Sequence, residues 1–94
     1  MHYQIKITSF VNEIGKKFSP EIKNAAKAAL KELAQNPNIG KELQGEINGF
    51  RSYRFMRYRI IYKIDTQENI IIVWVIGHRR DIYENFSGFL LQHS

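Results

Sequence analysis

Seven consecutive apolar residues, Ile70 to Ile76, place the strongest constraint on how this chain can fold. An amphipathic helix, or a strand with one solvated face, would need polar residues at a regular spacing, and this run has none. Such a run is typical of a strand that is covered on both faces. We therefore predict that it lies in the middle of a sheet and that Gly77 ends it.

The stretch Phe50 to Tyr62 predicts a β-hairpin that lies beside this central strand. If Met56 and Arg57 form its two-residue turn, Arg54 pairs with Arg59 across the two strands. Like charges directly opposite one another lower the stability of a sheet, and a bound anion would relieve the repulsion. Met-Arg is a poor sequence for a tight hairpin turn, so a wider loop with different pairing is the alternative.

Alternation along the two strands sorts the side chains of the hairpin onto two faces of the sheet. One face is mostly aromatic, and we expect it to pack on helices; it carries Tyr53, Phe55, Tyr58, Ile60 and Tyr62. We expect the opposite face to present the arginine pair, together with residues that follow the central strand; it carries Ser52, Arg54, Arg59 and Ile61.

The first half of the chain predicts one strand and two helices. Polar and apolar residues alternate from His2 to Ile7, as in a half-buried strand. Ser9 is a candidate N-cap for a helix of about ten residues. Ser19-Pro20 is a stronger helix start, and the apolar spacing that follows predicts a helix to about Gln35. The glycine-containing segment after this helix is predicted to be a loop.

These elements predict an α+β fold in the order β-α-α-β-β-β. We expect two N-terminal helices packed on one face of a four-stranded, mostly antiparallel sheet, with a short C-terminal helix or tail. A length of 94 residues suits a single domain, 1–94. The chain has no cysteine, so neither disulfides nor thiolate metal sites are available to it.

Charge narrows the choice of partners. The formal net charge is +5 and the pI is near 9.6, a balance that favours nucleic acid, an acidic protein or a membrane surface. Many small basic proteins bind nothing anionic, and it is the clustering of arginine that favours nucleic acid here. The N-terminus lacks the features of a signal peptide, and no window approaches the ~18 apolar residues of a membrane span. We therefore expect a cytoplasmic protein that does not enter a membrane.

The ionisable residues exclude several kinds of catalytic site. The three histidines lie far apart in the sequence and the acidic residues form no spaced ligand set, so we expect neither a metal nor a cofactor. No nucleophile elbow marks a serine hydrolase, and no glycine-rich loop with a lysine could cradle a phosphate.

A cationic surface can cleave RNA without a metal. Arginine stabilises the pentacoordinate phosphate, a base takes the 2′ proton, and an acid protonates the leaving oxygen. We predict Arg54, Arg59 and Arg79 as the source of charge, with His78 or Tyr83 as acid or base. Further RNA contacts are predicted at Arg51, Arg57, Lys63 and Arg80. The alternatives are structural: arginines that protect an exposed sheet, a histidine at a strand end and a core tyrosine.

Three motifs in the second half of the chain form a set. They are L-x-G-x-x-x-G from Leu43 to Gly49, Y-R-I-I-Y from Tyr58 to Tyr62, and V-I-G-H-R-R-D-I-Y from Val75 to Tyr83. The set resembles the RelE/ParE toxins of bacterial and archaeal toxin–antitoxin pairs. The RelE branch, which the resemblance favours, consists of metal-free endoribonucleases that cleave mRNA on the ribosome by 2′-OH attack, whereas ParE members inhibit DNA gyrase. Members of both branches form complexes with an antitoxin that neutralises them.

By matched position, the resemblance implies functional roles for Arg54, Arg59, Arg79 and Tyr83. Many relatives carry R-x-R-x-G-D-Y-R before the third strand, and this chain departs from that frame twice. Ser52 stands at the first arginine, and Met56-Arg57 replaces the Gly-Asp turn. The alternative function is therefore a binding toxin, such as a gyrase inhibitor, or a RelE-fold module that has lost cleavage.

Overall fold

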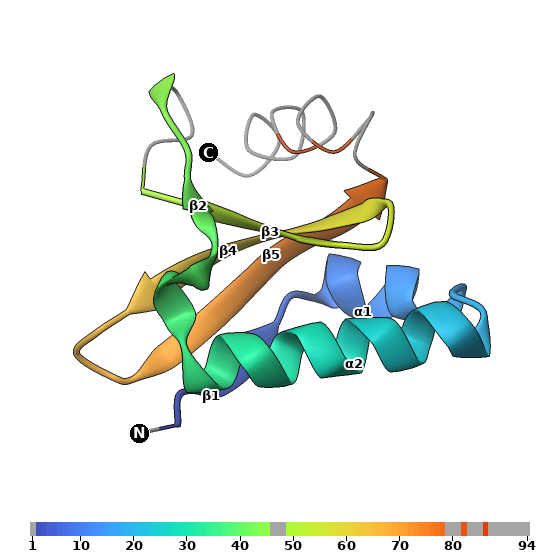
Figure 1. The fold of residues 1–94 in the computed structure, drawn as a ribbon, viewed down its shortest axis with the longest axis horizontal. Coiled ribbons are helices and arrows are strands. Elements are labelled where there is room, and N and C mark those ends of the chain that lie inside the picture. Colours follow the sequence, from blue (N-terminus) through green and yellow to red (C-terminus); the bar gives the residue numbers. More distant parts are fainter. Residues whose placement is uncertain (1, 46–48, 79–81, 83–85, 87–94) are drawn as a thin grey trace.

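The computed structural model describes residues 2–45, 49–78, 82 and 86. From residue 2 to residue 78, the described parts of the chain form two helices and five strands in the order β1 Gln4–Ile7, α1 Ser9–Lys16, α2 Pro20–Gln35, β2 Lys41–Glu42, β3 Arg51–Phe55, β4 Tyr58–Asp65 and β5 Ile70–His78. A 3₁₀ turn, η1 Pro37–Ile39, connects α2 to β2. Both helices lie on the same side of the sheet (Figure 1), which confirms the predicted α+β layers. We call this the helix side, and the opposite one the far side.

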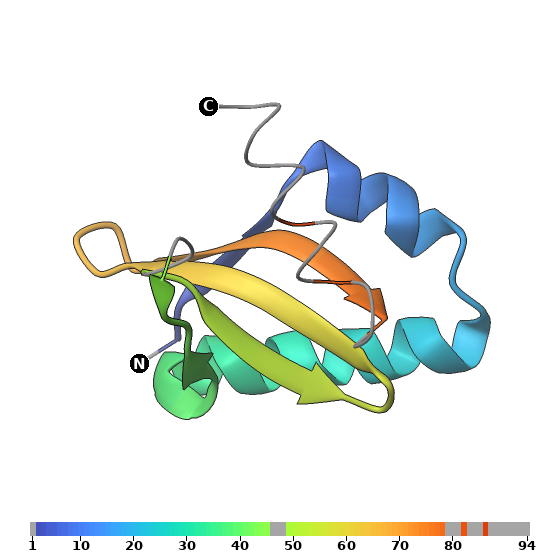
Figure 2. The same cartoon turned by 90° about the horizontal axis from the view of Figure 1, so that it is seen from above.

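The strands are arranged in the order β1-β5-β4-β3-β2, which can be followed from above in Figure 2. The apolar strand β5 is an interior strand, as predicted, and pairs parallel with β1 and antiparallel with β4. The remaining pairs are antiparallel, so the sheet is mostly antiparallel, as expected.

The prediction of four strands is wrong, because β2 adds a fifth. Its two residues pair with Arg51 and Ser52 at the edge of the sheet, inside a segment that we predicted to be a loop. So short a strand has no periodicity that a sequence could reveal. Tertiary contacts hold it: the Arg51 guanidinium donates to the Gly40 carbonyl at 2.8 Å and to Glu42 Oε1 at 3.0 Å.

Each helix begins at a hydroxyl cap. The Ser19 hydroxyl accepts from the Ile22 amide at 3.4 Å, and α2 then runs from Pro20 to Gln35 as predicted. The cap of α1 is Thr8 and not Ser9, and the helix has eight residues where about ten were expected. The Thr8 hydroxyl accepts from the Val11 amide at 3.3 Å and also donates to the Trp74 carbonyl at 3.0 Å. This second bond, invisible in the sequence, ties the start of α1 to β5.

The hairpin has the predicted register. Phe55 pairs with Tyr58 and Arg54 with Arg59, so Met56 and Arg57 form a two-residue turn. Met56 adopts a φ of 53°, in the left-handed region that costs a residue with a Cβ about 1–2 kcal/mol. The turn therefore forms although its first residue does not suit it.

One irregularity interrupts the pairing of β4 with β5. Ile61 pairs with Val75 while the next residue, Tyr62, pairs with Val73, so Trp74 is an extra residue in β5. Before this bulge Val73 faces the helix side, and after it Ile76 does. Trp74 and Val75 both pack on the far side.

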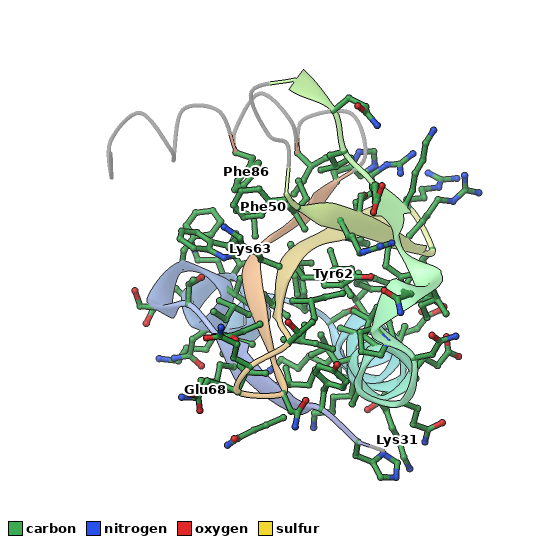
Figure 3. All side chains as sticks on the ribbon, turned by 90° about the vertical axis from the view of Figure 1, so that its left-hand side faces the viewer. Lys31, Phe50, Tyr62, Lys63, Glu68 and Phe86 are labelled. Carbon is green, nitrogen blue, oxygen red and sulfur yellow. The ribbon has the colours of Figure 1, made fainter. Side chains whose placement is uncertain are left out.

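Two apolar clusters cover the two faces of the sheet. The cluster on the helix side joins α1 and α2 to the sheet and includes the aromatic face predicted for the hairpin; its buried members are Val11, Ala26, Ala29, Leu33, Phe55, Ile60, Tyr62, Ile71, Val73 and Ile76. The far side carries a second cluster beside the arginine pair that was predicted there; its buried members are Leu43, Ile61, Val75, Ile82 and Phe86, with Phe50 and Trp74 packed against them. Figure 3 shows Phe50 and Phe86 together on this side.

Tyr62 connects the helix-side cluster to the segment after α2. Its ring is fully buried, and its hydroxyl donates to the Pro37 carbonyl at 2.6 Å and accepts from the Gly40 amide at 3.0 Å. Burial raises the pKa of this phenol above its ordinary value. These two bonds hold the polypeptide between α2 and β2 against β4, and thereby position the acceptors of Arg51.

A substitution at Met56 tests the strain in the hairpin turn. Because glycine adopts a positive φ freely and the Met56 side chain is half exposed, Met56→Gly is expected to stabilise the protein by about 0.5–1 kcal/mol, as a rise in Tm. Arg57→Gly is the matched control, since Arg57 shares the turn but has no positive φ, and it should give no gain. A Tm for Met56→Gly no higher than wild type would contradict the strained turn.

Substitutions at Tyr62 and Gly40 test the connection between α2 and β2. Tyr62→Phe leaves the Pro37 carbonyl and the Gly40 amide without their partner, and we expect a loss of about 1–3 kcal/mol in the free energy of unfolding. Gly40→Ala should cost a comparable amount, because its Cβ would overlap the phenol and come within 2.8 Å of Tyr62 Cε1. Urea denaturation measures both. Gly15→Ala, whose Cβ meets nothing within 4 Å, is the control that should not lose stability.

Candidate functional site

Arg54 and Arg59 lie opposite one another at the end of the hairpin, on the far side of the sheet. Arg54 is exposed and Arg59 is half-buried, while Arg57 in the adjoining turn is exposed. Directly across β5 from Arg59 is Gly77. The absence of a side chain at Gly77 leaves room for Ile82, whose Cδ1 would be 2.9 Å from a Cβ placed there. Two guanidinium groups thus share one patch of the far side at the edge of the second apolar cluster.

Such a patch suits a phosphate group. Opposed guanidinium groups repel one another, and an anion between them turns the repulsion into attraction. Each guanidinium can bind two oxygens of one phosphate in a planar, bidentate contact. The arginine pair is therefore the part of the described chain that we take as the candidate site.

His78 is on the other side of the sheet. It pairs with Tyr58, and its ring packs edge-on against the Tyr58 ring at a centroid distance of 6.0 Å. Tyr58 in turn packs against Phe18 and Phe55 on the helix side. The bulge at Trp74 causes this placement, because it reverses the alternation of β5 before the strand reaches His78. The structure does not bring His78 together with the arginine pair, and its role as acid or base stays a prediction.

The other predicted RNA contacts are dispersed. Arg51 faces the helix side opposite Tyr62, and its guanidinium donates to Gly40 and Glu42. Lys63 is exposed on the far side, with Nζ 5.3 Å from the centroid of the Phe50 ring. It therefore shares a side of the sheet with the arginine pair. Three further predicted site residues, Arg79, Arg80 and Tyr83, lie outside the described residues.

Ser52 stands at the position of the first arginine in the R-x-R-x-G-D-Y-R frame of many RelE/ParE relatives. It lies on the same side as the arginine pair, opposite Ile61, but only 4% of its surface is exposed. A cationic side chain at position 52 would be buried away from water. The local sequence carried no signal of this burial, since strand alternation puts Ser52 on the same face as the exposed Arg54.

Within the ranges that the structure covers, no group of three histidine or acidic residues could hold a metal ion. In the same part of the chain, no helix is long and apolar enough to cross a membrane.

Both the sequence and the fold of this chain are similar to those of known proteins. Residues 5–83 match the family described as the ParE toxin of the type II toxin–antitoxin system parDE. Toxin RelG of Mycobacterium tuberculosis is 32% identical to this chain over 85 residues, which cover 88% of this chain and 98% of RelG.

Solved structures share the fold. A chain of the RelBE2 toxin–antitoxin complex of Mycobacterium tuberculosis superposes with a TM-score of 0.77 at 28% identity, covering 84% of this chain and all of that one. The isolated RelE toxin of E. coli gives a TM-score of 0.72 at 17% identity, covering 94% and 98% of the two chains. At that identity the likeness shows the fold alone, which is RelE-like.

Ser52→Arg tests whether position 52 can join the arginine patch. Because the site is buried on the far side, an arginine there should lower the free energy of unfolding by at least about 1 kcal/mol. Thr66→Arg adds the same charge in an exposed turn and should leave the Tm near that of wild type. If Ser52→Arg melts like Thr66→Arg, the position is accessible and our reading of the patch is wrong.

Proposed function

Since this chain belongs to the ParE toxin family of type II toxin–antitoxin systems, we propose that it is a toxin that cleaves mRNA on the ribosome without a metal. The proposal assigns it to the RelE-like branch of the RelE/ParE superfamily. It acts in the cytoplasm, where translated mRNA and its antitoxin are present.

The observation that carries the proposal is the pairing of Arg54 with Arg59 on an accessible patch of the far side. In the proposed reaction the two guanidinium groups bind the oxygens of the scissile phosphate. The ribose 2′-OH gives its proton to a base and attacks phosphorus. The bond from phosphorus to the 5′ oxygen breaks, that oxygen receives a proton from an acid, and the other product ends in a 2′,3′-cyclic phosphate.

Charge supplies the larger part of the catalysis. The pentacoordinate phosphate carries one more negative charge than the diester, and preorganised arginines stabilise that charge more than the ground state. Arg79 adds a third cation, and Tyr83 or His78 exchanges the protons. Tyr83 is the better candidate of the two, because His78 packs on Tyr58 at the helix side.

A gyrase-inhibiting toxin is the second candidate. Two observations favour it: the matched family is that of ParE, and Ser52 supplies no third cation at the patch. In this function the arginine patch binds an acidic surface of gyrase instead of a phosphodiester.

An antitoxin is the expected protein partner in either case. Several of the solved structures that share this fold are toxin–antitoxin complexes, including those of Mycobacterium tuberculosis and Pyrococcus horikoshii. We propose that this chain likewise forms a hetero-oligomer with a cognate antitoxin.

The double substitution Arg54→Ala with Arg59→Ala tests the ribonuclease. Removing one transition-state donor typically lowers kcat by ~10²–10³, so we expect cleavage of translated mRNA to fall below detection and growth arrest to disappear. Primer extension on mRNA after induction in cells measures the cuts. The control is Lys6→Ala with Lys17→Ala, which removes two exposed cations outside the patch and should leave cleavage unchanged.

Three outcomes separate the candidates. Cuts that disappear only in the arginine variant support the ribonuclease. Equal cutting by the arginine variant and wild type places the site elsewhere and overturns the assignment. Uncut mRNA after wild-type induction, together with DNA-damage signalling, identifies the gyrase inhibitor instead.

A further inference from the structure

Met56, the first residue of the hairpin turn, is both exposed and strained. It is 50% exposed, the largest value among the exposed large apolar residues of the described chain. Its φ of 53° lies in the left-handed region, which a residue with a Cβ disfavours. Glycine or asparagine would suit the turn better and would also remove the apolar surface from solvent.

The turn between β4 and β5 shows what the same backbone conformation ordinarily requires. Asn69, the residue before β5, adopts a φ of 56°, and asparagine tolerates this conformation. Backbone strain of the kind found at Met56 is concentrated at active sites and ligand-binding positions. The fold gives no reason for a methionine at this position, whereas a contact between its side chain and a ligand would.

The neighbours of Met56 are cationic. Arg57 shares the turn and is exposed, and the pair formed by Arg54 and Arg59 comes next along the two strands. Residues two apart in a strand, such as Arg54 and Met56, are separated by about 7 Å. The ribose and base of one nucleotide span such a distance. A nucleotide whose phosphate lies at the arginine pair therefore reaches Met56 with its base.

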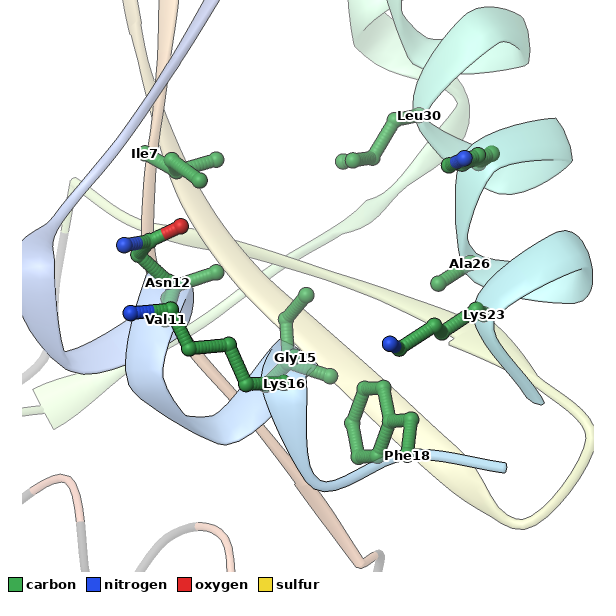
Figure 4. Close-up of a pocket in the computed structure, with 11 residues that line it drawn as sticks. Ile7, Val11, Asn12, Gly15, Lys16, Phe18, Lys23, Ala26 and Leu30 are labelled. Carbon is green, nitrogen blue, oxygen red and sulfur yellow. The ribbon is translucent and has the colours of Figure 1, made fainter. Parts of the chain in front are cut away.

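The other exposed apolar side chains of the described residues lie outside the hairpin; they belong to Ile7, Phe10 and Ile39. Ile7 lines an open groove of about 360 Å³ between α1 and α2 (Figure 4), on the helix side of the sheet. Lysines line the same groove, namely Lys16, Lys23 and Lys27. The arginine pair is on the far side, so RNA that binds there has Met56 as its apolar neighbour.

An exposed methionine beside cations suits an unpaired nucleobase. The thioether is polarisable and packs favourably on aromatic rings. Single-stranded RNA exposes the faces of its bases, and proteins that bind it combine cations for the phosphates with side chains on which the bases pack. A membrane surface would need a broader apolar face than one side chain provides.

We propose that Met56 packs on the face of the nucleobase next to the phosphate bound by Arg54 and Arg59, while Arg57 binds the adjoining phosphate. The choice of single-stranded RNA as the ligand rests on the proposed function, and the contact itself rests on the strained turn. A contact with the face of a base does not read its hydrogen-bonding edge. Met56 therefore fixes the position of the nucleotide relative to the arginine pair without selecting one base over another.

A pair of oligonucleotides tests the contact with the base. One is a short oligouridylate with 2′-O-methyl riboses, which 2′-OH attack cannot cleave, and the other has the same backbone without bases. Each is titrated into the full-length protein at low salt, and fluorescence anisotropy measures the affinity. We expect Met56→Gly to weaken binding of the oligouridylate about threefold to tenfold and to leave binding of the abasic strand unchanged.

Three variants serve as matched comparisons. Met56→Leu keeps an apolar side chain in the turn and should bind the oligouridylate nearly as wild type does. Arg57→Ala should weaken binding of both strands by the same factor and lower the salt slope of log K by about 0.7, because it removes a phosphate contact. Ile39→Ala shortens an exposed apolar side chain outside the hairpin and should change neither affinity. Thermal melting of each variant establishes that it is folded.

The binding result is separate from the proposed function, because neither oligonucleotide can be cleaved. Wild-type affinity of Met56→Gly for the oligouridylate overturns the contact, and cuts seen by primer extension would still support the ribonuclease. Equal loss on both strands also overturns it and assigns Met56 to the shape of the turn. Binding to anionic lipid vesicles but to neither strand overturns it in favour of a membrane surface. A loss that depends on the base, in a protein that leaves mRNA uncut, retains the contact and overturns the ribonuclease.

Discussion

The extra residue in β5 determines which side chains meet the helices and which face away from them. Before Trp74, the side chain of Val73 faces the helix-side core. After Trp74, the side chains of Ile76 and His78 face that same side. Without the bulge, Ile76 and His78 would face the far side, and Val75 and Gly77 would face the helices. Thr8 bonds to the carbonyl of this same Trp74, so the start of α1 is fixed to the irregular point of the strand.

The two faces of the sheet therefore carry different structural features. The helix side holds the larger core and the lysine-lined groove, and Tyr62 fastens the segment after α2 to it. The far side holds a smaller cluster that includes Phe50, Trp74 and Phe86, whose rings meet edge-to-face. The arginine pair is at the margin of that cluster. The sheet between two apolar layers sets the backbone positions from which Arg54 and Arg59 extend, directly opposite one another.

Much of this arrangement was predictable from local sequence, and some was not. The register of the hairpin and the opposition of Arg54 and Arg59 followed from strand alternation and a two-residue turn. Strand β2, the second cluster and the burial of Ser52 did not follow, because each depends on a contact between segments far apart in the chain. His78 was grouped with the arginines by its place in a motif, and the bulge moved it to the other face.

The sequence by itself determined that β5 is central, that two helices cover one face, and that two arginines oppose each other near a tight turn. These properties depend on residues close together in the chain, whose spacing sets periodicity, capping and turn geometry. Tertiary structure decided the rest: the side that His78 faces, the covering of the far side by Ile82 and Phe86, and the gap between α1 and α2. Those features arise where distant segments pack, and packing depends on shapes that no local pattern records.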